Sequence, residues 1–406
     1  MVFLRRLGEY EMTEFLVRHF VKDYENTSKV SVRTAYGVLA SVTGIFCNIL
    51  LFAVKWLIGY LLHSISVMAD AFNNLSDAAS SIIGFIGVKM AGKPADADHP
   101  FGHGRIEYIS AFIVAFLVIQ VGFSLFKTSV GKILHPEPMT FKWISVVILI
   151  LSICVKFWLS AFNRKLGKRI NSKVMLATAA DAMGDVVTTG AAALSLLVFG
   201  LWNVNIDGIT GLMVSAAVLF AGYNIAKDTL APLIGEAIPP EVYEEISSFV
   251  EGFDGILGTH DLIVHNYGPS KSMASIHAEV SAGAEIAESH AIVDRIEREA
   301  ARKMGLLLVI HMDPVETDNE RLNTYRKMLE NVLADVDVRL SYHDFRMVGK
   351  DKNVCLIFDL VIPREYKDGA VGKLRTRISN EMRRRDPDCR CAITVENSYR
   401  SEEGVK

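Results

Sequence analysis

The chain has 406 residues, of which half are hydrophobic and 22% are charged, and its formal net charge is −3. A charge this close to zero gives no support for a nucleic acid or another polyanion as partner. Long apolar runs dominate from Tyr36 to about Gly235, whereas residues 236–406 have the composition of a soluble protein. We therefore expect at least two domains, the first of them in a membrane.

The first 35 residues carry charged side chains that interrupt any apolar core, including Arg5, Arg6, Glu9 and Glu11. A cleaved signal peptide needs such a core without interruption. We therefore expect residues 1–35 to form a cytoplasmic amphipathic segment on the membrane surface.

Six apolar segments follow in residues 36–235, each long enough to cross the hydrocarbon core as a helix, which takes about 20 residues. They lie at about 36–62, 64–91, 107–131, 142–163, 172–200 and 208–233. Lys and Arg gather in the N-terminal segment and in the connections after the second and fourth spans. The positive-inside rule then places both termini in the cytoplasm of a multi-pass cell-membrane protein.

Two of these spans carry polar residues four positions apart. Asn73 and Asp77 lie in the second span, and Asp181 and Asp185 lie in the fifth. Residues at this spacing share one face of a helix. Each pair is preceded three positions earlier by a possible accessory ligand, and these are Asp70 and Thr178.

Acids inside a membrane are costly and indicate a function. Each carboxylate at the helix centre costs about 2.5–3.5 kcal/mol, so the two in the fifth span need a bound cation, a proton or a water-filled cavity. Structural carboxylates hydrogen-bonded inside a helix bundle are the alternative. If the two pairs face each other, they offer three carboxylates and one amide oxygen, a donor set that suits Mn²⁺, Mg²⁺ or Ca²⁺ better than Zn²⁺.

The loop after the second span has a second group of possible ligands, namely Asp96, His99 and His103. They lie close in sequence and could hold a metal ion. The same loop is punctuated by proline and glycine, so it could equally be a capping and hinge segment.

Histidines also cluster in the soluble residues 236–318. His260, His277 and His311 fall in or beside segments that favour strands, at Leu262–Val264, Met273–Val280 and Leu306–Met312, and His290 falls in a predicted helix, Glu285–Met304. Asp313 lies beside the last histidine. Surface histidines at a dimer interface are the alternative to a metal site.

These motifs together resemble the cation diffusion facilitator family over about residues 30–318. The resemblance is carried by Ala-Asp70-x-x-Asn-x-x-x-Asp77, the loop Lys93–Gly104, the paired acids of the fifth span, Gly258-Thr-His-Asp261 and Ile310-His-Met-Asp-Pro314. It implies a homodimeric antiporter that exports divalent metal in exchange for protons. Zinc-transporting members usually have a histidine in the transport site, so this asparagine with three aspartates resembles the manganese-exporting subgroup.

The resemblance also implies which residues bind metal. The transport site would be Asn73, Asp77, Asp181 and Asp185. A structural or regulatory divalent metal would be bound in the cytoplasmic domain by His260, His277, His290, His311 and Asp313. These imidazole ligands favour zinc even where manganese is the cargo.

Residues 319–406 extend beyond that resemblance and repeat the preceding domain, with a second predicted helix at 369–384 and a closing strand at Arg390–Val395. Self-similarity at a fixed offset indicates duplication. His343 aligns with His260, but Phe358 aligns with His277. We expect this second copy to keep the fold, to lose most ligands and to have a structural or regulatory role.

The sequence as a whole predicts an α-helical membrane protein with six transmembrane helices, a cytoplasmic ferredoxin-like (βαββ) α+β domain and a second, duplicated α+β module. Its expected function is proton-coupled Mn²⁺ export by a homodimer in the lipid bilayer, with Zn²⁺ or Fe²⁺ as alternative cargo. No cofactor and no nucleic-acid partner are expected. A membrane metal sensor is an alternative from another class, although a sensor needs no site within the bilayer. The lack of a nucleophile–base motif, phosphate loop or dinucleotide fingerprint argues against an enzyme.

Overall fold

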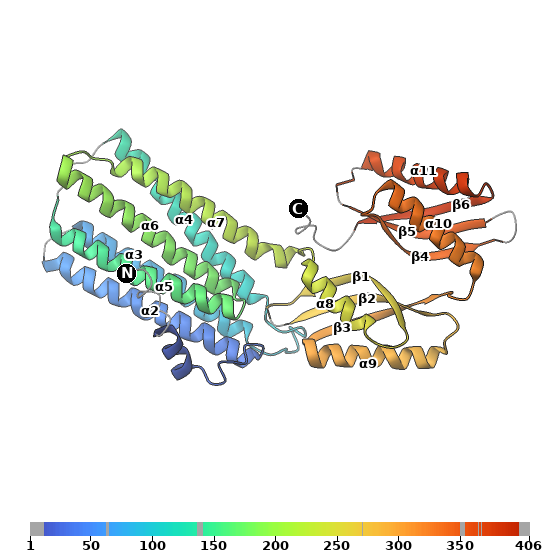
Figure 1. The fold of residues 1–406 in the computed structure, drawn as a ribbon. Coiled ribbons are helices and arrows are strands. Elements are labelled where there is room, and N and C mark those ends of the chain that lie inside the picture. Colours follow the sequence, from blue (N-terminus) through green and yellow to red (C-terminus); the bar gives the residue numbers. More distant parts are fainter. Residues whose placement is uncertain are drawn as a thin grey trace. The chain divides into compact units, whose positions relative to one another are not determined.

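A computed structural model describes residues 12–61, 65–135, 141–269, 271–349, 354–363, 365–366 and 368–397 (Figure 1). The contacts divide the chain into two compact units. The first comprises Met1–Glu236 with Asn266–Lys271, and the second comprises Ala237–His265 with Ser272–Lys406. The boundary at residue 236 coincides with the predicted end of the membrane domain.

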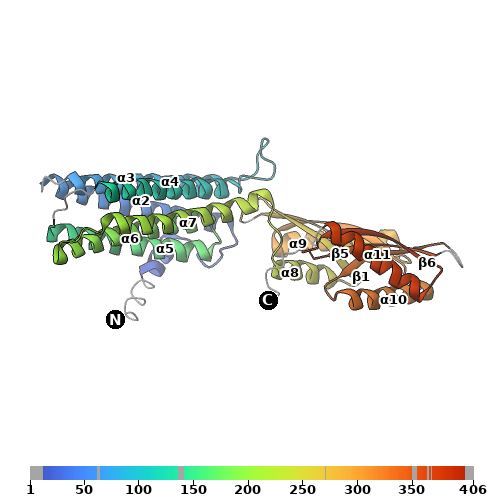
Figure 2. The same cartoon turned by 90° about the horizontal axis from the view of Figure 1, so that it is seen from above.

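The first unit contains six long helices that run side by side in both views (Figures 1 and 2). They are α2 (Val30–Leu61), α3 (Ile65–Ala91), α4 (Ile106–Leu134), α5 (Trp143–Arg169), α6 (Lys173–Trp202) and α7 (Asp207–Ile234). The most extensive pairings are α2 with α3, α4 with α7 and α5 with α6. Each of the six predicted spans therefore corresponds to one helix.

Five of these helices, in the described part of the chain, are long and apolar enough to cross a membrane. The remaining helix, α3, has 27 residues and thus sufficient length. Its apolar character is diluted by polar side chains, among them Asp70, Asn73 and Asp77. The helix that departs from ordinary membrane composition is thus one of the two predicted to supply transport-site ligands.

A short helix over residues 12–20 packs against the long helices of the first unit. Val17 is fully buried and belongs to the same core as Tyr36. Glu14 forms an ion pair of 2.8 Å with Lys165 of α5. Phe20 on the same helix is exposed. The described part of the predicted amphipathic segment thus has one face on the helix bundle, and it exposes Met12 and Phe15 as well as Phe20, while residues 1–11 lie outside the described chain.

The second unit begins with an α+β module, here called the first module. It consists of α8 (Pro240–Glu251), β1 (Ile256–Asn266), β2 (Ser272–Ser281), α9 (Ile286–Met304) and β3 (Leu306–Val315). The sheet order is β1-β2-β3, and β2 and β3 are parallel. Every second residue of β2 is buried, so one face packs on the helices and the other is available for a site.

The strand order corrects the predicted βαββ arrangement. The helix α9 follows β2 and precedes β3, so the module reads ββαβ after its leading helix. The reason is the short connection between β1 and β2, which joins neighbouring strands directly. A parallel pair such as β2 and β3 needs a longer crossover, and α9 provides it.

The second module, from residue 320 to 397, has the same order of elements. They are α10 (Glu320–Val336), β4 (Ser341–Val348), β5 (Val354–Ile362), α11 (Asp368–Arg385) and β6 (Cys389–Asn397). Its sheet order is β4-β5-β6, with β5 and β6 parallel. Asp261 in β1 and Asp344 in β4 share the same unusual positive φ, at 50° and 53°. The module has its own core around Leu329 and Phe358.

Candidate metal sites

A buried lysine lies between two of the predicted transport-site carboxylates. The Nζ atom of Lys156 on α5 is 2.6 Å from Asp77 Oδ2 on α3 and 2.7 Å from Asp185 Oδ2 on α6. Only 5% of the lysine side chain is exposed. Removing one partner of such a buried pair leaves an uncompensated charge, which is strongly destabilising. Three helices are thus joined through one cationic group.

The facing turns of α3 and α6 run antiparallel at this site. A Cβ added at Gly84 of α3 would lie 3.7 Å from the Thr178 hydroxyl on α6. Ser80, about one turn earlier on α3, hydrogen-bonds to Asp181, about one turn later on α6. Asp181 also interacts electrostatically with Asp185, the next acid on its own helix. The structure therefore brings three of the four predicted transport-site residues into one region.

The remaining transport-site positions are placed differently. Asn73 lies on an exposed part of α3, whereas its neighbour Asn74 is buried. The accessory Thr178 donates its hydroxyl to the Val174 carbonyl of its own helix at 3.0 Å. Asp70 lies within α3, but its side chain is outside the described residues. Among the described residues, the three carboxylates Asp77, Asp181 and Asp185 do not converge within 4.8 Å as the ligand groups below do.

Lys156 is a site residue that the sequence motifs did not indicate. The signal that indicates it is a lysine within an apolar segment, because a buried ammonium is as costly in a membrane as a carboxylate. A lysine in the fourth span opposite acids in the second and fifth would have suggested an internal counter-ion. The charge of Lys55, buried on α2, also acts on Asp77.

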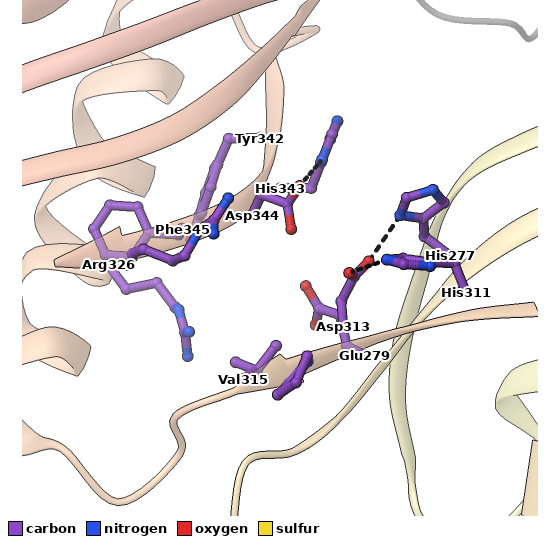
Figure 3. A pocket seen from close by; sticks show the side chains of 12 residues that line it. His277, Glu279, His311, Asp313, Val315, Arg326, Tyr342, His343, Asp344 and Phe345 are labelled. Carbon is purple, nitrogen blue, oxygen red and sulfur yellow. Dashed lines mark hydrogen bonds and ion pairs between the residues drawn. The ribbon is translucent and has the colours of Figure 1, made fainter. Parts of the chain in front are cut away.

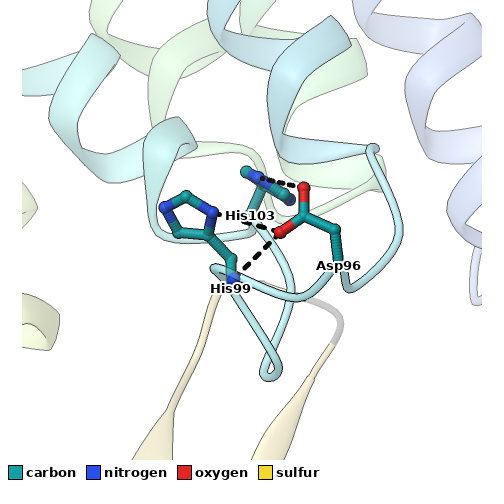
Figure 4. A group of neighbouring side chains, drawn as sticks. All are labelled: Asp96, His99 and His103. Atoms are coloured by element: carbon teal, nitrogen blue, oxygen red, sulfur yellow. Dashed lines mark hydrogen bonds and ion pairs between the residues drawn. The ribbon is translucent and has the colours of Figure 1, made fainter.

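The loop residues Asp96, His99 and His103 do come together, as Figure 4 shows. Asp96 Oδ1 is 3.2 Å from His99 Nδ1, and Asp96 Oδ2 is 3.5 Å from His103 Nε2. Lys93 also contacts Asp96, at 2.6 Å. The hydrogen bond from Lys93 holds the pKa of Asp96 well below its usual range. The Asp96 carboxylate is therefore able to bind a cation, and the ammonium group of Lys93 already forms an ion pair with it.

The parallel pairing of β2 and β3 builds the site of the first module. The register places His277 beside His311 and Glu279 beside Asp313. Asp313 Oδ2 is 2.8 Å from His277 Nδ1 and 3.2 Å from His260 Nε2, and Asp313 Oδ1 is 3.4 Å from His311 Nε2. Figure 3 shows His277 and His311 both directed at Asp313. A single carboxylate with three imidazoles around it matches a zinc-type donor set.

The fourth predicted histidine of this site is placed elsewhere. His290 lies on the exposed face of α9 and is in none of the metal-ligand groups found among the described residues. The helix α9 covers the core face of the sheet through Val293 and Ile296. His260, His277, His311 and Asp313 lie together without His290.

Two protein-family profiles match the chain, one within the first unit and one over the first module of the second unit. The profile described as "Cation efflux transmembrane domain" matches residues 41–234, and the one described as "Cation efflux protein, cytoplasmic domain" matches residues 238–315. An uncharacterized transporter of Methanocaldococcus jannaschii is 32% identical over 266 residues, which are 64% of this chain and 92% of the relative. A cation-efflux pump, FieF, of Escherichia coli is 27% identical over 285 residues, which are 69% of this chain and 94% of the relative. The second module lies beyond both profile matches.

Proposed function

The chain belongs to the cation efflux family, also called cation diffusion facilitators, and on this basis we propose that it exports Mn²⁺ from the cytoplasm in exchange for protons. Members of the family are membrane transporters and not enzymes, and metal export is therefore the activity of this chain. The identity of the metal and the coupling to protons are the proposed parts.

The observation that carries the proposal is the proximity of Asp77, Asp181 and Asp185 across the two facing helices α3 and α6. All three offer hard oxygen donors. Hard donors suit Mn²⁺, whereas imidazole and thiolate favour Zn²⁺. Asn73, one turn before Asp77 on the same helix, is the proposed fourth ligand. Zn²⁺ or Fe²⁺ is the alternative cargo, since both also bind oxygen ligands.

The charges of the span helices support exchange with protons. Away from their cytoplasmic ends, α2, α3, α5 and α6 contain four aspartates, Asp70, Asp77, Asp181 and Asp185, and two lysines, Lys55 and Lys156, whose formal charges sum to −2. The remaining charge of −2 is balanced by one divalent ion or by two protons. Since a buried net charge is costly, the empty carrier is favoured with protons bound and the loaded carrier without them. An exchange of two protons per Mn²⁺ is then electrically neutral.

Exchange also needs two access states. In the state described here, Lys156 occupies the position of a cation between two carboxylates. Mn²⁺ entry favours movement of the ammonium away from at least one of them, because the two cations repel each other strongly at such short distances. We assign Lys156 as the internal cation that competes with Mn²⁺ for these carboxylates.

The rest of the molecule is proposed to act as follows. Both termini face the cytoplasm, and the protein is a homodimer, a proposal that the match to the cytoplasmic-domain profile supports. The shared element order and the matching φ values of Asp261 and Asp344 support ferredoxin-like modules that arose by duplication. His260, His277, His311 and Asp313 bind a regulatory or structural zinc-type ion.

Transport by purified protein in vesicles tests the proposal. Vesicles acidic inside should take up Mn²⁺ through molecules whose cytoplasmic face is outside. Uptake of Zn²⁺, Fe²⁺ and Cd²⁺ is measured in parallel. Zn²⁺ uptake without Mn²⁺ uptake would contradict the cargo, and uptake that ignores the pH gradient would contradict the coupling to protons.

A further inference from the structure

The second module contributes a histidine that the proposed function leaves unexplained. His343, on β4, is 5% exposed. Neither of its ring nitrogens has a hydrogen-bond partner among the described residues. A buried polar group without a partner costs about 1–3 kcal/mol, so such a group normally has a ligand or a function.

Carboxylates surround this ring at distances too long for hydrogen bonds. His343 Nε2 is 3.6 Å from Asp261 Oδ1 of the first module and 3.8 Å from Glu396 Oε2 of β6. On the other side of the ring, Nδ1 is 3.9 Å from Asp344 Oδ2. The His260 ring is stacked on the His343 ring, with centroids 4.2 Å apart. The donors thus come from both modules, and His343 forms no hydrogen bond with any of the three carboxylates.

Such spacing is what a metal ion requires of its ligands. Tetrahedral ligands that lie about 2.0–2.2 Å from Zn²⁺ are about 3.3–3.6 Å from one another. The distance from His343 Nε2 to Asp261 Oδ1 fits this range, and the distance to Glu396 exceeds it slightly. Direct ion pairing would instead bring the atoms to about 2.7–2.9 Å.

We propose that His343, Asp261 and Glu396, together with His260, bind a divalent metal ion of the zinc class between the two modules. Two imidazoles and two carboxylates form a mixed nitrogen and oxygen donor set typical of such ions. The second module, which lacks counterparts to His277 and His311, thus supplies one histidine and one carboxylate to a site that neither module forms alone. The second module was expected to lose most ligands, and the proposal gives a role to His343, the histidine that aligns with His260.

The local electrostatics agree with this geometry. Burial raises the pKa of Glu396, and the negative charge of Asp261 raises it further. For Asp261, burial acts in the same direction, but the hydrogen bond from His260 and the charge of His343 outweigh it and lower its pKa. Acids and imidazoles in this arrangement interact strongly, and a bound dication would neutralise the two carboxylates.

The new site shares His260 with the site of the first module. His260 Nδ1 is 3.4 Å from Asp261 Oδ2, whereas its Nε2 is 3.2 Å from Asp313 Oδ2. A neutral imidazole has only one free lone pair on nitrogen. His260 can therefore ligate one ion at a time while its ring is neutral, and occupancy of the two sites is linked.

An open cavity of about 540 Å³ beside these residues gives an ion access to the region between the modules. Figure 3 shows His277, His311 and Asp313 of the first module on one side of it, and His343 and Asp344 of the second module on the other. The cavity wall thus includes groups from both proposed cytoplasmic sites.

Zinc titration of the full-length chain in detergent, after removal of bound metal with a chelator, tests the proposal. The variants are His343→Phe, chosen to fill the buried space, and His265→Ala, which removes an exposed histidine on the same strand as His260. We expect His343→Phe to lose one tight Zn²⁺ equivalent, or to weaken it at least tenfold, and His265→Ala to match the unaltered chain. The visible spectrum of bound Co²⁺ should lose intensity in proportion.

A second variant keeps the test decisive if His343→Phe does not fold. Asp261→Asn combined with Glu396→Gln retains His343 and removes both anionic ligands. It should also weaken one Zn²⁺ equivalent at least tenfold. Unchanged Zn²⁺ stoichiometry and affinity in a folded variant of either kind would overturn the proposal. Manganese transport is not part of this readout, so failure here is distinct from failure of the proposed transport function.

Discussion

Replacing Lys156 with methionine removes the internal cation of the proposed transport site and keeps most of the side-chain volume. The side chain is 5% exposed, and its ammonium contacts two carboxylates at 2.6 and 2.7 Å. At an effective dielectric constant of about 20, each contact corresponds to roughly 6 kcal/mol of gross attraction, before the cost of desolvation. The variant therefore leaves the carboxylates short of positive charge.

The consequence for metal binding follows from the same distances. A divalent ion about 4 Å from the ammonium is repelled by roughly 8 kcal/mol at that dielectric constant, unless the lysine moves away. Because the flexible side chain can move, only part of this repulsion is felt. We expect Lys156→Met to bind Mn²⁺ about 10- to 1,000-fold more tightly, which is about 1.4–4 kcal/mol. Release should be slower, so the maximal transport rate should fall.

Calorimetric Mn²⁺ titration in detergent and uptake into vesicles measure the two effects. Lys132→Met is the matched control, because Lys132 forms a 2.6 Å ion pair with Asp207 between α4 and α7, outside the proposed transport site. That control should leave Mn²⁺ affinity unchanged. Weaker Mn²⁺ binding in Lys156→Met, or binding and transport equal to those of the unaltered chain, would refute the role of the lysine as a competing cation.

Three further predictions concern other parts of the chain. Phe358→Ala empties a fully buried position in the second module and should cost about 3–5 kcal/mol, measured as faster hydrogen exchange in β5 and β6 of the full-length protein. Hydrogen bonds from Arg339 hold the pKa of Asp337 well below its usual range, so its carboxylate stabilises the fold above the unfolded pKa near 4 and this contribution is lost as pH falls further. Asp337→Asn should therefore destabilise by about 1 kcal/mol at pH 7, with the difference from the unaltered chain shrinking below pH 4 in thermal unfolding. Lys93→Ala frees Asp96 and should raise Zn²⁺ affinity at the loop several-fold in calorimetric titration, and unchanged affinity would argue against a loop site.

Spacing and hydrophobic pattern were enough to predict the elements of the fold. Each predicted span has its helix, because a run of about 20 apolar residues has few other stable states in a membrane. Spacing of four residues also placed Asp181 and Asp185 on one helix, and the structure adds Asp77 from α3. The predicted βαββ order of elements was wrong, because the sequence pattern did not show that β1 and β2 are joined directly.

Contacts between distant parts of the chain could not be predicted in the same way. Lys156 is 79 residues from Asp77, and only helix packing brings them together. The alignment of the two modules did find that His343 corresponds to His260. It could not indicate that the two rings stack on each other, because that depends on how the modules pack.

The central claim is that Mn²⁺ and protons exchange at the carboxylates joined by Lys156. Its most direct test records Mn²⁺ uptake and internal pH in the same vesicles, for the unaltered chain and for Asp185→Asn. We predict that about two protons leave for each Mn²⁺ that enters, and that Asp185→Asn abolishes both fluxes. Mn²⁺ uptake without a change in internal pH, or normal exchange by Asp185→Asn, would contradict the account.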